Sequence, residues 1–172
     1  MKKEQVCDAL ESLRVITNET HMIVIGTQSL HGLHPNVPDE IMYSREVDVI
    51  LKNKASLANW ISDVVGDETP FEVERGYFID HIRPKPGLPI LADGWEQRLT
   101  RRNEINNCTI DYLSPEDLAI AKLGAGREKD FPFVAGMALK NIISIDAIGV
   151  QVLNRMLSAG RPNSVRCKRQ AA

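Results

Sequence analysis

Two acidic side chains, Glu46 and Asp48, are separated by a single residue at the start of the apolar run 47–51. On a β-strand, residues i and i+2 point to the same face, which places two such carboxylates roughly 7 Å apart at Cβ. Like charges at this separation are unfavourable unless a cation compensates them, and Mg²⁺ or Mn²⁺ prefers carboxylate oxygens. We therefore expect Glu46 and Asp48 to be metal ligands. The solvated face of an edge strand would show the same pattern.

A turn of small residues precedes the acids. Gly26 follows the apolar run 22–25, and Thr27 and Ser29 come directly after it. Glycine lets the backbone turn sharply and approach a ligand closely, and a hydroxyl beside free N–H groups at a helix start can hold a phosphate. The P-loop pattern GxxxxGK[ST] is missing from this stretch. We expect Gly26, Thr27 and Ser29 to contact phosphate, with a plain strand-to-helix turn as the alternative.

Hydrophobic spacing predicts the elements that position these residues. We expect helices over 3–17, 54–66, 130–140 and 146–157, strands over 22–25, 47–51, 73–82 and 108–113, and a helical turn or two over 95–102. A further helix begins at Ser114, because Ser114 is a good N-cap and Pro115 suits the first helical position. This order predicts an α/β (α+β) fold, a mixed β-sheet flanked by helices with a helical C-terminal part.

Length and charge limit the class of protein. The 172 residues, of which 43% are hydrophobic, suit a single domain over 1–172. Within it we expect a core over 20–113, C-terminal helices over 114–158 and a flexible basic tail over 160–172. A formal net charge of −2 argues against a protein that coats DNA or an anionic membrane. The three cysteines are far apart and form no CxxC pair, which favours reduced thiols and a cytoplasmic location.

Strand, Gly-x-x-Ser turn and acid-x-acid strand together resemble the nucleotidyltransferase fold of the polymerase-beta type. Two later stretches add to the resemblance: "LADGWEQRL" at 91–99 and "LSPEDLAIAKLGAGREKD" at 113–130. They are similar to small DUF6036-like bacterial proteins of nucleotidyltransferase type. These in turn are similar to the AbiEii-type toxins of abortive-infection and toxin–antitoxin systems. The resemblance covers about residues 20–135.

The resemblance implies roles for charged residues near the end of the second stretch. It implies that Lys122 contacts a nucleotide phosphate and that Asp130 completes the site. Charge arguments agree, since a triphosphate is strongly anionic and would be repelled by the acid pair alone. Lys122 and Lys129 are seven residues apart, so both can face one side of a helix. Arg127 or Lys129 can then add a second phosphate contact.

A third carboxylate is expected in such sites, where it acts as a base on the attacking hydroxyl. Asp80 and Asp111 both lie in predicted strands. We favour Asp80, because its strand follows the helix after the acid pair. Asp111 is then expected to cap the turn into the helix at Ser114. The expected catalytic set is Glu46, Asp48, Asp80, Lys122 and Asp130, and the expected nucleotide-binding set is Gly26, Thr27, Ser29, Lys122, Arg127 and Lys129.

These interpretations predict an enzyme that uses Mg²⁺ or Mn²⁺ to transfer a nucleotidyl group from an NTP to a hydroxyl of an RNA, such as tRNA, or of a protein. The toxin resemblance adds the expectation of a cognate antitoxin protein; no membrane partner is expected. The alternative is a non-catalytic nucleotide- or partner-binding protein with a degenerate nucleotidyltransferase fold. The lone glycine of the turn favours this alternative, whereas the intact acid pair and the set of Lys122 and Asp130 count against it.

Overall fold

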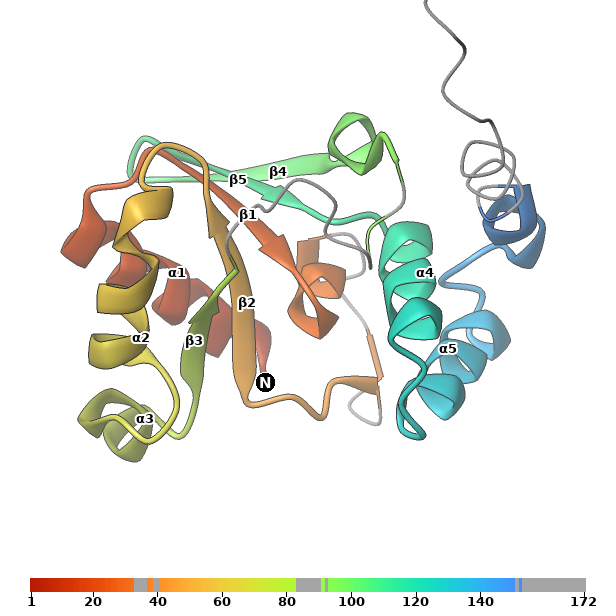
Figure 1. Cartoon of the computed structure of the whole chain (residues 1–172), viewed down its shortest axis with the longest axis horizontal. Coiled ribbons are helices and arrows are strands. Elements are labelled where there is room, and N and C mark those ends of the chain that lie inside the picture. Colours follow the sequence, from red (N-terminus) through yellow and green to blue (C-terminus); the bar gives the residue numbers. More distant parts are fainter. Residues whose placement is uncertain (33–36, 39–40, 83–90, 92, 151, 153–172) are drawn as a thin grey trace, which may run out of the picture.

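A five-stranded mixed β-sheet organises the protein, seen in a computed structural model that describes residues 1–32, 37–38, 41–82, 91, 93–150 and 152 (Figure 1). Its strands are β1 (His21–Ile25), β2 (Glu46–Leu51), β3 (Phe78–His81), β4 (Thr100–Ile105) and β5 (Cys108–Tyr112), in the spatial order β3-β2-β1-β5-β4. The pairs β1–β2 and β4–β5 are antiparallel, whereas β1–β5 and β2–β3 are parallel. The predicted α/β class with a mixed sheet is confirmed.

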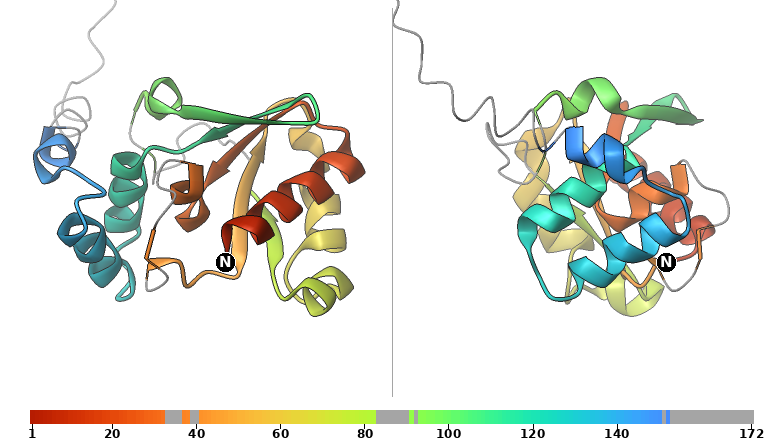
Figure 2. Two further views of the ribbon diagram at one scale, coloured as in Figure 1. Left: turned by 180° about the vertical axis from the view of Figure 1, so that it is seen from behind. Right: turned by 90° about the vertical axis from the view of Figure 1, so that its right-hand side faces the viewer.

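Helices cover both faces of this sheet (Figures 1 and 2). They are α1 (Lys3–Thr17), α2 (Ala58–Val65), α3 (Pro70–Arg75), α4 (Pro115–Ala125) and α5 (Asp130–Leu139), with 3₁₀ turns η1 (Thr27–Gly32), η3 (Ala55–Leu57) and η4 (Trp95–Arg98). Residues 145–150 are helical as well, as predicted. No helix in the described ranges has the length and apolar character needed to cross a membrane. The predicted tail over 160–172 lies outside the described residues.

Two apolar clusters, one on each face of the sheet, explain why the central strands are almost continuously hydrophobic. One cluster joins α1 and α2 to Val47 and Val49 of β2, both fully buried. The other joins η1, α4 and α5 to Ile23 of β1 and Ile50 of β2. Since side chains alternate along a strand, Glu46 and Asp48 share the face of Ile50. The acids therefore lie on the α4/α5 side of the sheet.

The third predicted strand, 73–82, is wrong in its first half. Thr69 accepts a hydrogen bond from the Glu72 backbone N–H, Pro70 occupies the first turn, and Gly76 ends the helix in the left-handed conformation. These are the usual start and stop signals of a helix, and they make α3. Val73 is 84% exposed on it, so its apolar side chain is not the core residue that a strand would require. The strand begins only at Phe78.

The predicted helical turns over 95–102 are only partly right, because the chain passes from η4 into strand β4 at Thr100. An ion pair ties η4 to α4: Arg98 donates to both carboxylate oxygens of Asp117, at 2.9 and 2.6 Å. Asp117 is fully buried and also accepts from the Ser114 hydroxyl at 2.7 Å. The Ser114 oxygen in turn caps α4, as predicted, by accepting from the Asp117 N–H. The two stretches that carry the family resemblance are thus joined by one buried contact.

Candidate active site

Strand register brings the acid pair to the turn after β1. Asp48 is the partner of Ile25 in the antiparallel β1–β2 ladder, and Ile25 directly precedes Gly26. Gly26 has a φ of 64°, and a Cβ placed on it would overlap the Asp48 carboxylate. Two features therefore disfavour a side chain at this position: the positive φ of the backbone and the close approach of the Asp48 carboxylate. The prediction that Gly26 serves a close backbone approach is consistent with this geometry, although what it approaches is a carboxylate.

The parallel β2–β3 ladder brings the third carboxylate to the pair, since Asp80 is the register partner of Asp48. Burial, then Glu46, then Asp80 raise the pKa of Asp48 to about 7. Burial and the charge of Glu46 likewise raise the pKa of Asp80. The three carboxylates thus form a site with excess negative charge. No three His, Cys, Asp or Glu side chains within the described ranges converge closely enough to hold a metal by themselves.

Asp111 lies elsewhere on the sheet and has a different partner. It is buried, and its Oδ2 lies 2.7 Å from Nε2 of His21 on the neighbouring strand. The N-terminal cap of α4 is made by Ser114 and Asp117, and the expectation that Asp111 caps the turn into α4 stays a prediction. Of the two carboxylates considered as the third acid, the structure places Asp80 and not Asp111 beside the pair.

Lys122 reaches toward the acids from α4. Its Nζ lies 3.8 Å from Oδ1 of Asp130 and 5.3 Å from the centre of the Phe133 ring. Burial lowers its pKa; the charges of Asp130, Asp48 and Glu46 act in the opposite direction. A partly desolvated ammonium close to an anionic cluster is well placed to receive further negative charge.

Asp130 is held mainly by Arg127, which donates to it from Nε at 2.8 Å and from Nη2 at 3.2 Å. The carboxylate is 2% exposed, and burial alone would raise its pKa. The hydrogen bonds from Arg127 and the charge of Lys122 outweigh burial, so the pKa of Asp130 lies below its ordinary value. Asp130 is thus an ionised anchor for two cations and has little freedom to act on a substrate.

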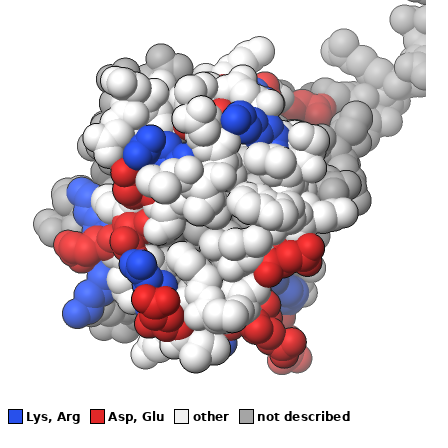
Figure 3. Space-filling view, turned by 90° about the vertical axis from the view of Figure 1, so that its left-hand side faces the viewer, with Lys and Arg blue, Asp and Glu red and all other residues white. Residues whose placement is uncertain are grey.

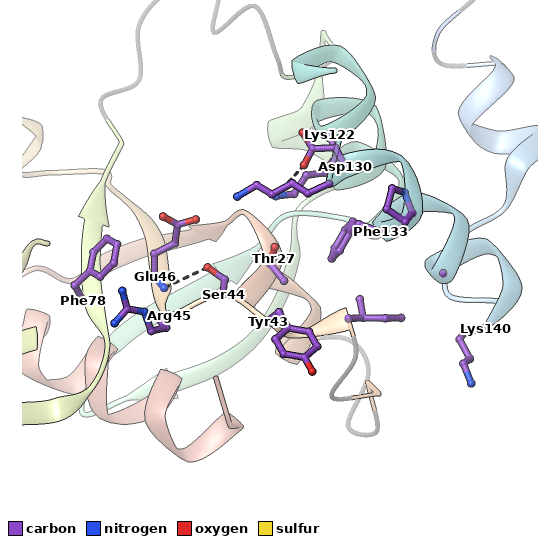
Figure 4. A pocket seen from close by; sticks show the side chains of 14 residues that line it. Thr27, Tyr43, Ser44, Arg45, Glu46, Phe78, Lys122, Asp130, Phe133 and Lys140 are labelled. Atoms are coloured by element: carbon purple, nitrogen blue, oxygen red, sulfur yellow. Dashed lines mark hydrogen bonds and ion pairs between the residues drawn. The ribbon is translucent and has the colours of Figure 1, made fainter. Parts of the chain in front are cut away.

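A cleft of ≈ 780 Å³ opens between these elements (Figure 4). Its lining includes Thr27, Ser44, Glu46, Lys122, Lys129 and Asp130, together with an apolar section contributed largely by α5. Asp48 and Asp80 are not among the lining residues; both are half-buried on the sheet beside Glu46. This volume falls in the range of small-molecule sites in proteins. Glu46 therefore lies on the sheet side of the cleft, and Lys122 and Lys129 lie on its helical side.

Two predicted details of this site are wrong. Ser29 is fully buried and its hydroxyl donates to the Gly26 carbonyl at 2.8 Å, so it does not face the cleft. Lys122 and Lys129 are not on one helix, because Gly126 ends α4 in the left-handed conformation; both nevertheless line the cleft. Arg45, directly before β2, lines the cleft together with Glu46.

Sequence reasoning missed most of the other cleft residues, among them Tyr43, Ser44 and Phe78. Ser44 accepts a hydrogen bond from the Glu46 N–H at 3.2 Å and so fixes the start of β2. Phe78 is the register partner of Glu46, which a parallel β2–β3 pairing would have indicated. Tyr43 lies in a loop whose conformation no spacing rule predicts.

A family model described as "nucleotidyltransferase of unknown function (DUF6036)" matches residues 3–169. The chain belongs to this family. The match spans nearly the whole chain, including the sheet, the acids and α4, which carries Lys122. No curated protein and no solved structure matches the chain. None of the matches links the chain to AbiEii-type toxins.

Proposed function

We propose that this protein uses Mg²⁺, or Mn²⁺, to transfer a nucleotidyl group from an NTP to a hydroxyl of an RNA, such as tRNA, or of a protein. One observation carries the proposal: Glu46, Asp48 and Asp80 gather on one sheet face, across a cleft from Lys122. This arrangement separates a cation-binding side from a phosphate-binding side. The family description supports the same chemistry.

The carboxylates of Glu46 and Asp48 fit a divalent metal ion that binds together with the substrate. Glu46 and Asp48 supply two carboxylates, and Mg²⁺ in proteins usually takes one or two carboxylates plus substrate phosphates and water. The raised pKa of Asp48 marks a negative charge that lacks compensation. When bound, the metal would supply charge neutralisation and a template for in-line displacement.

The remaining residues of the cleft would bind phosphate and move one proton. The acceptor hydroxyl oxygen forms a bond to the α-phosphorus of the NTP, the bond to the bridging oxygen breaks, and pyrophosphate leaves. Asp80 takes the hydroxyl proton, for which its raised pKa suits it. Lys122 and Lys129 neutralise the phosphates, and Thr27, which lines the same cleft, adds a phosphate contact. The contact between Arg127 and Asp130 holds the turn between α4 and α5 in place.

The face over α2 and α3 does not favour an RNA acceptor. On the face over α2 and α3, Lys and Arg alternate with Asp and Glu around a wide uncharged area (Figure 3). Such a face offers no continuous positive track for a phosphate backbone. The resemblance to AbiEii-type toxins further supports a toxin whose transfer activity a cognate antitoxin protein would block.

A second candidate is a protein that binds the nucleotide without transferring it. The buried hydroxyl of Ser29 favours it, because the turn then offers the triphosphate fewer donors than expected. The two candidates differ only in turnover, so one set of assays separates them.

The test combines binding with transfer. Calorimetry with each of the four NTPs in Mg²⁺ should show binding that the double variant Glu46→Ala/Asp48→Ala loses and that Asp63→Asn, an exposed carboxylate on α2, keeps. α-Phosphate-labelled NTP should then label tRNA or protein in the presence of the wild type only. Binding without any labelled product would favour the second candidate. If the double variant keeps both NTP binding and labelling, both candidate functions are overturned.

A further inference from the structure

The cleft extends past the acids into a section that takes no part in the metal and phosphate contacts proposed above. We call this section the apolar arm and define it by Ile41, Tyr43, Pro132, Phe133 and Gly136. In Figure 4, Phe133 and Lys140 lie on one side of Thr27, whereas Glu46, Arg45 and Phe78 lie on the other. The arm therefore begins beside the phosphate-binding lysines and runs along α5, away from the carboxylates.

Tyr43 presents a free aromatic ring from a fixed backbone. Its side chain is 88% exposed, while its neighbour Met42 is 4% exposed. On its other side, the Ser44 carbonyl accepts hydrogen bonds from Gln28 Nε2 at 3.1 Å and from the amino group of Met1 at 3.0 Å. A ring held in this way loses little entropy when it stacks on a ligand. The ring of Phe133, in contrast, already carries the Lys122 ammonium over one face.

Gly136 leaves the wall of the arm without a side chain. A Cβ at this position would meet only Ile41, at 3.8 Å, which is ordinary contact. Glycine inside a helix costs about 1 kcal/mol relative to alanine, and neither a turn nor a positive φ requires it here. The missing side chain keeps the arm wider between α5 and Ile41 than a larger residue would.

The position of Asp80 orients the triphosphate relative to the arm. An in-line displacement places the attacking hydroxyl and the leaving pyrophosphate on opposite sides of the phosphorus. Asp80 lies on β3, on the far side of Glu46 from α5, so the acceptor approaches from the β3 side and the pyrophosphate leaves toward Lys122 and Lys129. The nucleoside is attached to the phosphorus off this axis, and the arm along α5 is the part of the cleft that can receive it. Lys129 and Lys140 are separated there by about 16 Å at 1.5 Å per residue, enough for a nucleotide to extend.

We propose that the apolar arm is a nucleobase subsite that binds the base through its faces and not through its edges. This inference rests on the proposed function, because it assigns the NTP that the acids and lysines would hold. The arm is lined by aromatic and aliphatic groups, and its polar side-chain atoms are the Tyr43 hydroxyl and, at its outer end, the Lys140 ammonium. Stacking of this kind tolerates every base. All four NTPs bind, with purines tighter than pyrimidines because their faces are larger.

The experiment measures Mg²⁺-dependent binding of the four NTPs and of inorganic triphosphate to the same protein. Wild type should bind each NTP at least about 10-fold tighter than triphosphate. Tyr43→Ala, which changes an exposed side chain, and Gly136→Leu, which fills the arm, should weaken NTP binding about 10-fold and leave triphosphate binding unchanged. Tyr43→Trp should restore tight binding. Gly124→Leu is the matched control, since Gly124 is an exposed helical glycine with open space around it, outside the cleft.

The outcomes separate this inference from the proposed function. If triphosphate and NTPs bind equally, or if Tyr43→Ala and Gly136→Leu bind NTPs as wild type does, the base subsite is overturned and the phosphate site stands. One NTP bound more than about 100-fold tighter than the others would also overturn it, because such discrimination requires edge contacts. If neither triphosphate nor any NTP binds, both proposals fail.

Discussion

Gly26 is the residue on which the geometry of the acid pair depends, because its missing Cβ leaves room for the Asp48 carboxylate. We expect Gly26→Ala to displace that carboxylate and to weaken Mg²⁺-dependent NTP binding at least 10-fold, as roughly expected for loss of one charged ligand. Gly76→Ala is the matched control, since Gly76 has a φ of 74° but nothing near its Cβ position. Both variants share the backbone strain of a positive φ.

Chemical denaturation and calorimetry together check this prediction. Gly76→Ala should lose stability and keep nucleotide binding, whereas Gly26→Ala should lose both. Equal nucleotide binding by the two variants would show that the position of Asp48 is not set by Gly26.

Asp48 is a second residue whose environment has a measurable consequence. An unfolded aspartate ionises near 3.8, but burial, Glu46 and Asp80 raise the pKa of Asp48 in the folded protein to about 7. The unfolded state therefore binds fewer protons between these values, so stability falls as pH rises from about 4 to 7 and stays lowered above that. Asp48→Asn removes the ionisable group and should stabilise the metal-free protein at pH 8 by about 1 to 3 kcal/mol.

Thermal unfolding at pH 4 and pH 8 measures this effect. The gain from Asp48→Asn should be present at pH 8 and small at pH 4, and the exposed control Asp63→Asn should show no such difference. Mg²⁺ with an NTP should raise the melting temperature of the wild type but not of Asp48→Asn. A gain that does not depend on pH would place its cause outside the ionisation of Asp48.

Among the elements, η4 and α4 are joined by the ion pair of Arg98 with Asp117, whose carboxylate is fully buried. Arg98→Ala would leave that charge without its cation, and breaking one side of a buried pair costs about 3 kcal/mol. The matched control is Arg75→Ala, since Arg75 pairs with Asp8 at the same kind of distance, 2.7 Å, but both side chains are exposed. Arg75→Ala should lose much less stability than Arg98→Ala.

Urea unfolding of the two arginine variants gives the comparison, and NTP binding gives a second measurement. Because Arg98 does not line the cleft, the folded fraction of Arg98→Ala should bind NTPs as the wild type does. Equal destabilisation by the two substitutions would mean that burial of Asp117 does not decide the strength of the contact.

How far the sequence predicts an element depends on whether the signal is local. The period of two placed Glu46 and Asp48 on one face of β2, and cap residues placed α4, because both patterns act within a few residues. Strand β4 is largely polar, so hydrophobic spacing gave no indication of it; only its pairing with β5 makes it a strand. The inward turn of the Ser29 hydroxyl depends on one carbonyl three residues away. Tertiary packing likewise decides that Lys122 on α4 and Lys129 in the turn before α5 line one cleft.

At the scale of the whole molecule, the cleft lies between the sheet and the helical layer of α4 and α5. A ligand bound in the cleft would therefore link the two layers. The sheet supplies Glu46, and the helical layer supplies Lys122 and Phe133. The helical layer packs on the sheet through its own apolar cluster, separate from the one under α1 and α2. A nucleotide in the cleft would contact the sheet and the full length of α5, whereas inorganic triphosphate with Mg²⁺ would contact the sheet and only the lysine end of the helical layer.

Hydrogen exchange at short times, which reports local opening, should resolve this difference. With Mg²⁺ and ATP, we expect slower exchange at the Gly26 turn, in residues 41–45 and along α5, and little change in α1, which does not line the cleft. With Mg²⁺ and inorganic triphosphate, protection should reach the turn and the start of α5 but not the end of α5 near Lys140. The reason is that the base, not the phosphates, fills the apolar arm. Protection at the turn with none along α5 in the presence of ATP would mean that the nucleotide leaves the cleft in another direction.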